Sequence, residues 1–345
     1  MDSMNQGHVT PPKTVLIWLI GVYLLILFMV AVGGITRLTG SGLSMTEWHP
    51  LMGWVPPLNH QDWVAVFDLY KTSPQYLEVN AWMGLEDFKQ IFFWEYVHRV
   101  LGRVIGLAFF LPWLYFVVRR RLKGVWIVKS VVAFILGGAQ GFMGWFMVQS
   151  GLVDVPEVSH FRLAAHLSLA FVLGTYVLWL ALDCLWVSSR RPSKRLYVPV
   201  LGFASLLAIQ VVYGAFMAGK RAGLLYPSFP DFLGSWFPAQ AWEGSGLWSV
   251  LIDNAHMIHV VHRWLAWIVA VVGVGVAFWV LKNRVSVRQG RTAFLLMGAL
   301  ILQFILGVLT VIWSVPLWTA VAHQVFGFVL VSVTGALLHA CVRTD

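Results

Sequence analysis

Apolar residues fill long uninterrupted stretches of this chain and do not alternate regularly with polar ones. A helix of about 20 apolar residues crosses the hydrocarbon core of a membrane, and eight stretches reach that length. They cover roughly 14–34, 93–118, 125–148, 161–187, 196–218, 257–281, 292–313 and 317–342. The pattern therefore predicts an all-α integral membrane protein with eight transmembrane helices.

Composition and charge narrow the class further. Of 345 residues, 59% are hydrophobic and only 11% are charged, whereas soluble domains carry about 25% charged residues. The formal net charge is +9, and the basic residues cluster before the first span, after the eighth, and between spans two and three, four and five, and six and seven. They are Lys13; Arg119, Arg120, Arg121, Lys123 and Lys129; Arg190, Arg191, Lys194 and Arg195; Lys282, Arg284, Arg288 and Arg291; and Arg343.

All of these basic clusters fall on one side of the membrane if the chain crosses it eight times, which is the positive-inside pattern. The sequence therefore predicts cytoplasmic termini, a multi-pass protein of a bacterial inner membrane, and no nucleic-acid partner. Cys184 and Cys341 lie near the cytoplasmic ends of spans four and eight, where a disulfide is not expected. Residues 1–13 form a cytoplasmic tail that lacks the features of a cleavable signal.

The two halves of the chain repeat the same motifs. His98-Arg99 in the second span recurs as His262-Arg263 in the sixth. An Ala-His pair followed by Phe-Val-Leu occurs in spans four and eight, and a Gln four residues before a Gly occurs in spans three and seven. These are Ala165-His166 with Phe171-Val172-Leu173, Ala322-His323 with Phe328-Val329-Leu330, Gln140 with Gly144, and Gln303 with Gly307.

Four spans per repeat give both halves the same orientation, a parallel repeat about an axis along the membrane normal. We expect two pseudo-symmetric four-helix bundles, 14–187 and 196–342, joined by a cytoplasmic linker at 188–195. Outer loops at 35–92 and 219–256, rich in Trp, Pro and Gly, should cap them. Bundles of this kind hold cofactors in their cores.

Four histidines stand at equivalent positions of this repeat: His98, His166, His262 and His323. All lie on inward-going helices within about two turns of the outer face, so they share one depth at 1.5 Å rise per residue. Ionisable residues inside a membrane are expensive and usually functional. A lone histidine could simply hydrogen-bond across helices, but four at repeated positions favour two haems, each held between two imidazoles. Zinc would need further ligands at the same depth.

Arginines near these histidines suit the propionates of a haem, because a guanidinium matches a carboxylate in a bidentate way. Arg99 and Arg263 directly follow two of the histidines, and Arg103 lies one turn deeper. Arg37 lies at the outer rim, where snorkelling toward lipid headgroups is an equally good explanation. We predict propionate contacts for all four, with Arg37 the least distinctive.

The two halves differ at one position of the histidine motif. Glu95 precedes His98 by three residues and shares its helix face, whereas His259 takes the equivalent place before His262. A carboxylate here could orient the imidazole of His98, or it could act as a catalytic acid or base beside a haem edge. The second interpretation makes the first half the site of the reaction and the second half the site of a permanent haem.

Together these motifs resemble the haem A synthase family over about residues 14–342. The resemblance rests on Glu95-Tyr96-x-His98-Arg99-x-x-Gly102-Arg103, on its counterpart at His262-Arg263, on the two later histidine spans, and on Gly33-Gly34-x-Thr36-Arg37-Leu38-x-x-Ser41-Gly42-Leu43-Ser44. Some members carry a cysteine pair in an outer loop. This chain has none there, so it is similar to the cysteine-free branch of proteobacteria and mitochondria.

The resemblance implies oxidation of a methyl group of haem O to a formyl group, which gives haem A for terminal oxidases. It also implies that His98 and His166 bind the substrate haem, that His262 and His323 bind haem b, and that Glu95 is an essential carboxylate. Membrane lipid surrounds such a protein, and haem O synthase and cytochrome oxidase assembly factors are its expected partners. The electron acceptor and a homo-oligomeric state are not specified, nor are the roles of His160, His256 and His259.

Two other functions compete with this interpretation. A non-catalytic dihaem cytochrome b, passing electrons between quinone and a partner, explains the four histidines but not the occurrence of Glu95 in one half only. A transporter or haem chaperone would explain a parallel repeat. It would need polar residues across the whole bilayer, and the inner halves of the spans are almost uniformly apolar.

Overall fold

The computed structural model describes residues 11–47, 53–152, 156–186 and 194–343, and its regular elements are helical there. Eight of the helices are long and apolar enough to cross a membrane, which confirms the predicted spans. They are α1 (Lys13–Leu38), α3 (Leu85–Val118), α4 (Val125–Gln149), α5 (His160–Leu185), α6 (Lys194–Gly219), α8 (Ala255–Asn283), α9 (Val287–Ile312) and α10 (Leu317–Val342). His8, His49, Arg190 and Arg191 lie outside the described residues, as does most of the predicted linker.

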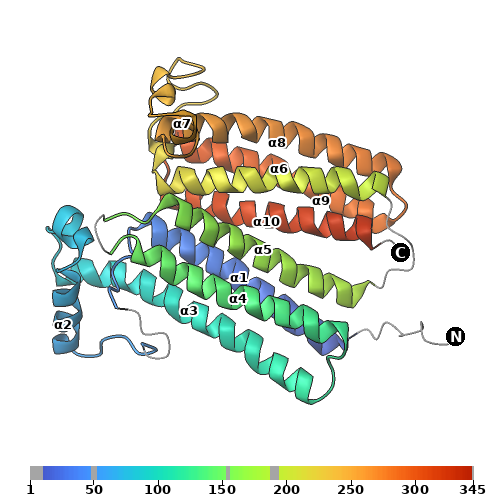
Figure 1. Cartoon of the computed structure of the whole chain (residues 1–345), viewed down its shortest axis with the longest axis horizontal. Coiled ribbons are helices and arrows are strands. Elements are labelled where there is room, and N and C mark those ends of the chain that lie inside the picture. The colour runs from blue at the N-terminus through green and yellow to red at the C-terminus, as the bar shows by residue number, and fades with distance from the viewer. Residues whose placement is uncertain (1–10, 48–52, 153–155, 187–193, 344–345) are drawn as a thin grey trace.

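Short helices occupy the two loops expected at the outer side (Figure 1). The first loop contains α2 (His60–Tyr70) and a π-helical turn (Tyr76–Asn80), and the second contains α7 (Leu247–Ile252) with 3₁₀ turns at Ala222–Leu224 and Ala239–Trp242. α3 begins eight residues before the predicted span, because its first turns pack against the first loop through Phe88 and Tyr70. The described parts of both loops thus contain helical turns at the outer end of the bundle.

Four helices form the centre of the molecule, and each half contributes two of them. α1 and α5 contact each other and also contact α10, while α6 contacts both α5 and α10. At this centre the rings of Phe171 and Phe328, which follow His166 and His323 by five residues, meet edge to face with centroids 5.2 Å apart. Equivalent residues of the repeat therefore touch where the halves join, as a pseudo-two-fold axis requires.

The outer four helices do not pack equally. In the second half α8 packs closely along α9, whereas in the first half α3 and α4 touch over a much shorter stretch. α3 and α8 lie at opposite edges of the array of long helices (Figure 1). The first half is therefore less tightly closed on its lipid-facing side.

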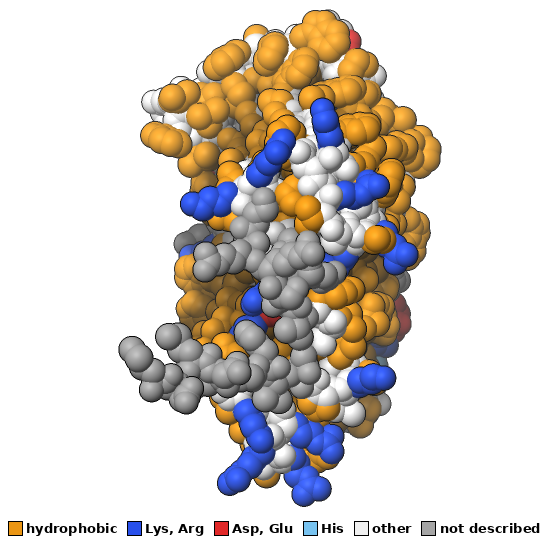
Figure 2. Space-filling model, turned by 90° about the vertical axis from the view of Figure 1, so that its right-hand side faces the viewer, with side chains coloured by type: hydrophobic (Ala, Val, Ile, Leu, Met, Phe, Trp, Pro, Cys, Tyr) orange, Lys and Arg blue, Asp and Glu red, His pale blue; other side chains and the backbone are white. Residues whose placement is uncertain are grey.

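Basic side chains gather at the end of the bundle where both termini lie. Figure 2 shows Lys and Arg side chains spread over this end with few acidic ones in view. The loops and helix ends there carry Arg119, Arg120, Arg121, Lys123, Lys194, Arg195, Lys282, Arg284 and Arg288. The distribution agrees with the positive-inside pattern, and the capping loops lie at the opposite end (Figure 1).

A buried polar cluster near the basic end is not apparent from the sequence. Asp183 of α5 has a side chain only 5% exposed, and its carboxylate accepts hydrogen bonds from Lys129 Nζ at 2.5 Å and His339 Nε2 at 3.0 Å. Lys129 belongs to α4 and His339 to α10. The cluster therefore joins the two halves at the inner end, and Arg343 Nε also lies 3.5 Å from the Asp183 carboxylate.

Candidate haem sites

Each of the four predicted histidines lies against a glycine of the neighbouring outward-going helix. A Cβ atom added to that glycine would approach the ring carbon Cε1 of the histidine to between 2.9 and 3.2 Å, closer than ordinary van der Waals contact. The pairs are His98 with Gly33, His166 with Gly144, His262 with Gly214, and His323 with Gly307. The absence of a side chain at each glycine is what gives the imidazole room against the neighbouring backbone.

The histidines also group in twos, one pair in each half. His98 of α3 and His166 of α5 belong to the first half, and His262 of α8 and His323 of α10 belong to the second. Two imidazoles from different helices of one bundle can take the two axial positions of a haem iron. Each half therefore offers two imidazoles on different helices, and their pairing around one haem stays a prediction.

The ring nitrogens of these histidines support this use. Nδ1 of His98, His262 and His323 is buried, with no hydrogen-bond partner among the described residues. A buried polar atom without a partner costs about 1–3 kcal/mol, so three such atoms at equivalent positions need an explanation. A haem iron bonded at Nε2 would leave the ring proton on Nδ1, so the iron alone would not satisfy that atom. The donor set, two imidazoles per half in an apolar bundle, nevertheless fits a haem.

Glu95 is held by groups other than the histidine beside it. Its side chain is only 3% exposed. Oε2 accepts hydrogen bonds from Ser44 Oγ at 2.7 Å and from the Met45 amide at 2.8 Å, and Oε1 accepts one from Arg99 at 2.5 Å. Glu95 therefore fixes the segment after α1 against α3, and it does not orient His98, whose Nδ1 lacks a partner among the described residues.

We call this hydrogen-bonded link between a helix and the segment after the preceding span a clamp. The second half forms the equivalent clamp with different side chains. His259 replaces Glu95, and its Nε2 accepts a hydrogen bond from Arg263 at 2.8 Å, four residues on. Its Nδ1 then donates to the Ala222 carbonyl at 2.9 Å, which fixes the segment after α6 against α8. The two halves thus share a helix-to-loop clamp, but only the first half places a carboxylate in it.

The predicted propionate arginines already have protein partners. Besides binding Glu95, Arg99 donates to the Met45 carbonyl at 2.7 Å. Arg263 donates to the Asp231 and Tyr226 carbonyls, and Arg103 stacks over Trp54 and donates to the Gly53 carbonyl at 3.2 Å. Arg37 reaches across to the second half and donates to the Ala218 carbonyl at 2.8 Å. Their contact with propionates stays a prediction.

The other histidines near the outer face have structural partners. His160 Nε2 donates to the Ile252 carbonyl at 2.8 Å and so links α5 to the second half. Beside it the exposed Asp253 pairs with Lys220, whose hydrogen bond lowers the pKa of the Asp253 carboxyl. His256 Nδ1 hydrogen-bonds the Tyr226 hydroxyl at 2.6 Å.

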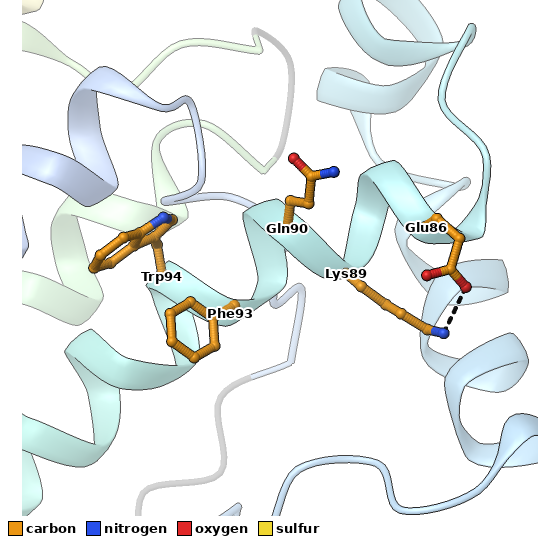
Figure 3. A pocket seen from close by; sticks show the side chains of 5 residues that line it. All are labelled: Glu86, Lys89, Gln90, Phe93 and Trp94. Atoms are coloured by element: carbon orange, nitrogen blue, oxygen red, sulfur yellow. Dashed lines mark hydrogen bonds and ion pairs between the residues drawn. The ribbon is translucent and has the colours of Figure 1, made fainter. Parts of the chain in front are cut away.

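A shallow pocket at the outer end of α3 lies apart from these sites. It is lined by Glu86, Lys89, Gln90, Phe93 and Trp94 (Figure 3), and Glu86 and Lys89 form an ion pair of 2.7 Å. None of the four histidines lines it. The polar pocket is therefore not where the imidazoles of the two sites lie.

We expect a side chain added at these glycines to displace the facing imidazole. Gly144→Val puts a branched side chain 3.1 Å from His166 Cε1, so the protein should lose haem from the first half and keep it in the second. Haem content and the low-spin absorbance spectrum of the purified protein measure this. Gly141→Val on the same helix is the control, because nothing lies within 4 Å of its Cβ position; equal haem loss in both variants would contradict the prediction.

Comparison with known proteins agrees with this geometry. Residues 16–334 match the model of the family described as cytochrome oxidase assembly protein. A protein of Nitrosospira multiformis named "Heme A synthase" is 44% identical, with 90% of this chain and 89% of the relative covered. Proteins of the same name from Sphingopyxis alaskensis and Flavobacterium psychrophilum are 41% and 39% identical, and each match covers at least 95% of both chains. The chain therefore belongs to the haem A synthases of the cytochrome oxidase assembly protein family.

Proposed function

We propose that this chain oxidises a methyl group of haem O to a formyl group in a bacterial inner membrane, with both of its termini in the cytoplasm. The observation that carries the proposal is a repeated pair of histidine sites of which only the first has a buried carboxylate clamp. Curated relatives named "Heme A synthase" support the same chemistry. A dihaem cytochrome b that only transfers electrons has no use for this difference between the halves.

In this proposal the substrate haem binds between His98 and His166, and haem b binds between His262 and His323. Haem b supplies one-electron redox chemistry in the second half. Neutral imidazoles bound through Nε2 to both sides of the substrate iron would leave it no open position. The glycines opposite the imidazoles support this proposal, because they leave room for the rings against the neighbouring helices.

The overall change is RCH₃ + H₂O → RCHO + 4 H⁺ + 4 e⁻, and a quinone or a small redox protein is the class of acceptor that balances it. Withdrawal of electrons from the ring makes the methyl carbon electron-poor, and water supplies the oxygen. Glu95 lies one turn from His98 on α3 and is held in place by three donors. A fixed carboxylate there stabilises positive charge at the reacting carbon or accepts a proton from it.

Haem analysis of purified variants tests the assignment of the two halves. We expect the wild-type protein, produced with ample haem O, to contain haem B together with O- or A-type haem. His98→Ala should lose mainly the O- and A-type haem, and His262→Ala mainly haem B, because each removes one axial bond. Extraction and chromatography measure both. Haem B alone in the wild-type protein would instead support the electron-transfer cytochrome.

Glu95→Gln tests the carboxylate itself. General acid–base groups typically contribute about 10²–10⁴-fold, so we expect haem A formation to fall by that order while haem O remains bound. The glutamine keeps the shape and an acceptor oxygen for Ser44 and Met45, but it places an NH₂ donor opposite Arg99 and so loses that ion pair. If Glu95 only anchored the loop, binding of haem O and its conversion would fall together. Haem A formation at the wild-type rate would remove the carboxylate from the mechanism.

A further inference from the structure

The face of α4 that meets the first histidine site continues deeper into the membrane with two more glycines. Gly141 and Gly137 precede Gly144 by three and seven residues, so they lie one and two turns below it on the same side of the helix. Among the described residues, nothing lies within 4 Å of the Cβ position of either glycine. Ala133, one turn below Gly137, is buried, so this side of α4 points into the bundle, whereas Gly137 itself is exposed. The space beside Gly137 is therefore an open hollow in the first half.

α3 borders the same space with small residues. Gly102 and Gly106 follow His98 by four and eight residues, and both are exposed. At the outer end of the space stands the imidazole of His98, whose buried Nδ1 has no partner among the described residues. Two turns below Gly106 the two helices meet, because Trp113 stacks on Phe134 of α4 with ring centroids 6.0 Å apart. The gap between α3 and α4 thus begins at the histidine site and is closed at its inner end by aromatic rings.

The second half fills the equivalent space with side chains of α9. By the repeat, the counterparts of Gly141 and Gly137 are Phe304 and Leu300, three and seven residues before Gly307. Leu300 is 4% exposed, and its Cδ1 lies 2.7 Å from the Cβ position of Gly273 in α8. Phe304 packs against Trp267 of α8 with ring centroids 4.7 Å apart. Side chains of α9 therefore close against α8 at the two levels where α4 has none.

Larger side chains of α3 do not take up the space. Phe109 stands where α8 has Gly273, but its ring packs on Trp18 of α1 with centroids 4.9 Å apart. No described atom comes within 4 Å of the Cβ position of Gly137. Arg103 is directed to the first loop, where it donates to a backbone carbonyl at 3.2 Å. Within the described residues, neither helix fills the gap.

Haem O differs from haem B chiefly in one substituent, a long farnesyl-derived chain in place of a vinyl group. In a membrane such a chain gains little from leaving lipid for protein, because lipid tails are equally apolar. Selection between the two haems then depends on whether the protein leaves room for the chain beside the haem. An overfilled site costs typically about 1–3 kcal/mol, so one side chain in the path of the farnesyl chain is enough to discriminate.

We infer that the gap between α3 and α4 takes the farnesyl chain of haem O. Gly137 and Gly141 let the first half accept this haem, whereas Leu300 and Phe304 restrict the second half to haem B. The inference rests on the proposed function, because it requires that the histidines of both halves bind haem. It gives the two halves different haems although their ligands are the same. Substitution along the gap changes which haem binds and not whether the histidines bind one.

Competition between the two haems tests this inference without turnover. Protein in lipid nanodiscs is equilibrated with equal amounts of haem O and haem B, without an electron acceptor, and the bound haems are quantified by extraction and chromatography. In a His262→Ala background, which leaves the first site, haem O should predominate. Adding Gly137→Leu, the residue of the second half, should lower the ratio of bound haem O to haem B by roughly 10-fold or more.

The matched control is Gly138→Ile, which gives the adjacent glycine its own counterpart, Ile301. Nothing described lies within 4 Å of the Cβ position of Gly138. However, Ile135 and Phe142, three residues before it and four after it, are 62% and 57% exposed, so the new side chain enters lipid. The haem ratio should stay at the wild-type value. A low-spin spectrum in both variants shows that the iron site is intact.

The reciprocal variant Phe304→Gly examines the second half. In a His98→Ala background, which leaves the second site, the protein should bind haem B almost exclusively. Adding Phe304→Gly removes the ring that packs against Trp267 and should raise the ratio of bound haem O to haem B by roughly 10-fold or more. A general loosening of the fold would weaken the binding of both haems and leave their ratio unchanged.

The possible outcomes separate this inference from the proposed function. An unchanged haem ratio in Gly137→Leu overturns the inference, as does an equal change in Gly138→Ile. If Gly137→Leu binds no haem, Phe304→Gly decides, and exclusive binding of haem B there overturns it too. Equal binding of both haems at the wild-type first site contradicts the inference and leaves the proposed function standing. If the wild-type protein shows no low-spin haem with two imidazole ligands in either half, the proposed function itself has failed.

Discussion

The approach of an imidazole to a bare backbone is the contact on which the rest of this structure depends. In an apolar bundle a histidine nitrogen has few partners, and its burial is costly unless something bonds it. Glycines at 33, 144, 214 and 307 let the rings lie against the neighbouring helices. The same glycines fix the spacing of four helix pairs. Helix packing and ligand position are therefore set by the same contacts, which repeat in both halves.

A symmetric framework makes its few asymmetries informative. The first half has Glu95 where the second has His259, and a short contact between α3 and α4 where α8 and α9 pack closely. Both differences fall in the half proposed to bind the substrate. One haem has to react and be replaced, whereas the other has to stay, and the two differences suit that division of roles.

The spans, the repeat and the four histidines could be predicted from the sequence because each depends on local hydrophobicity or on motifs that recur at identical spacing. The partners of Glu95 could not, since Ser44 is 51 residues away and nothing in the motif specifies it. The Asp183–His339 contact joins residues 156 apart.

The most direct test of two unequal haem sites is an exchange experiment on the wild-type protein in lipid nanodiscs, without an electron acceptor. Protein that carries unlabelled haem O and haem B is incubated with an excess of both haems labelled with ⁵⁷Fe, and the mass of each bound haem is followed over time. The account predicts that labelled haem O replaces its unlabelled counterpart while haem B keeps its original iron. Exchange of both haems at one rate, or of haem B first, would contradict it.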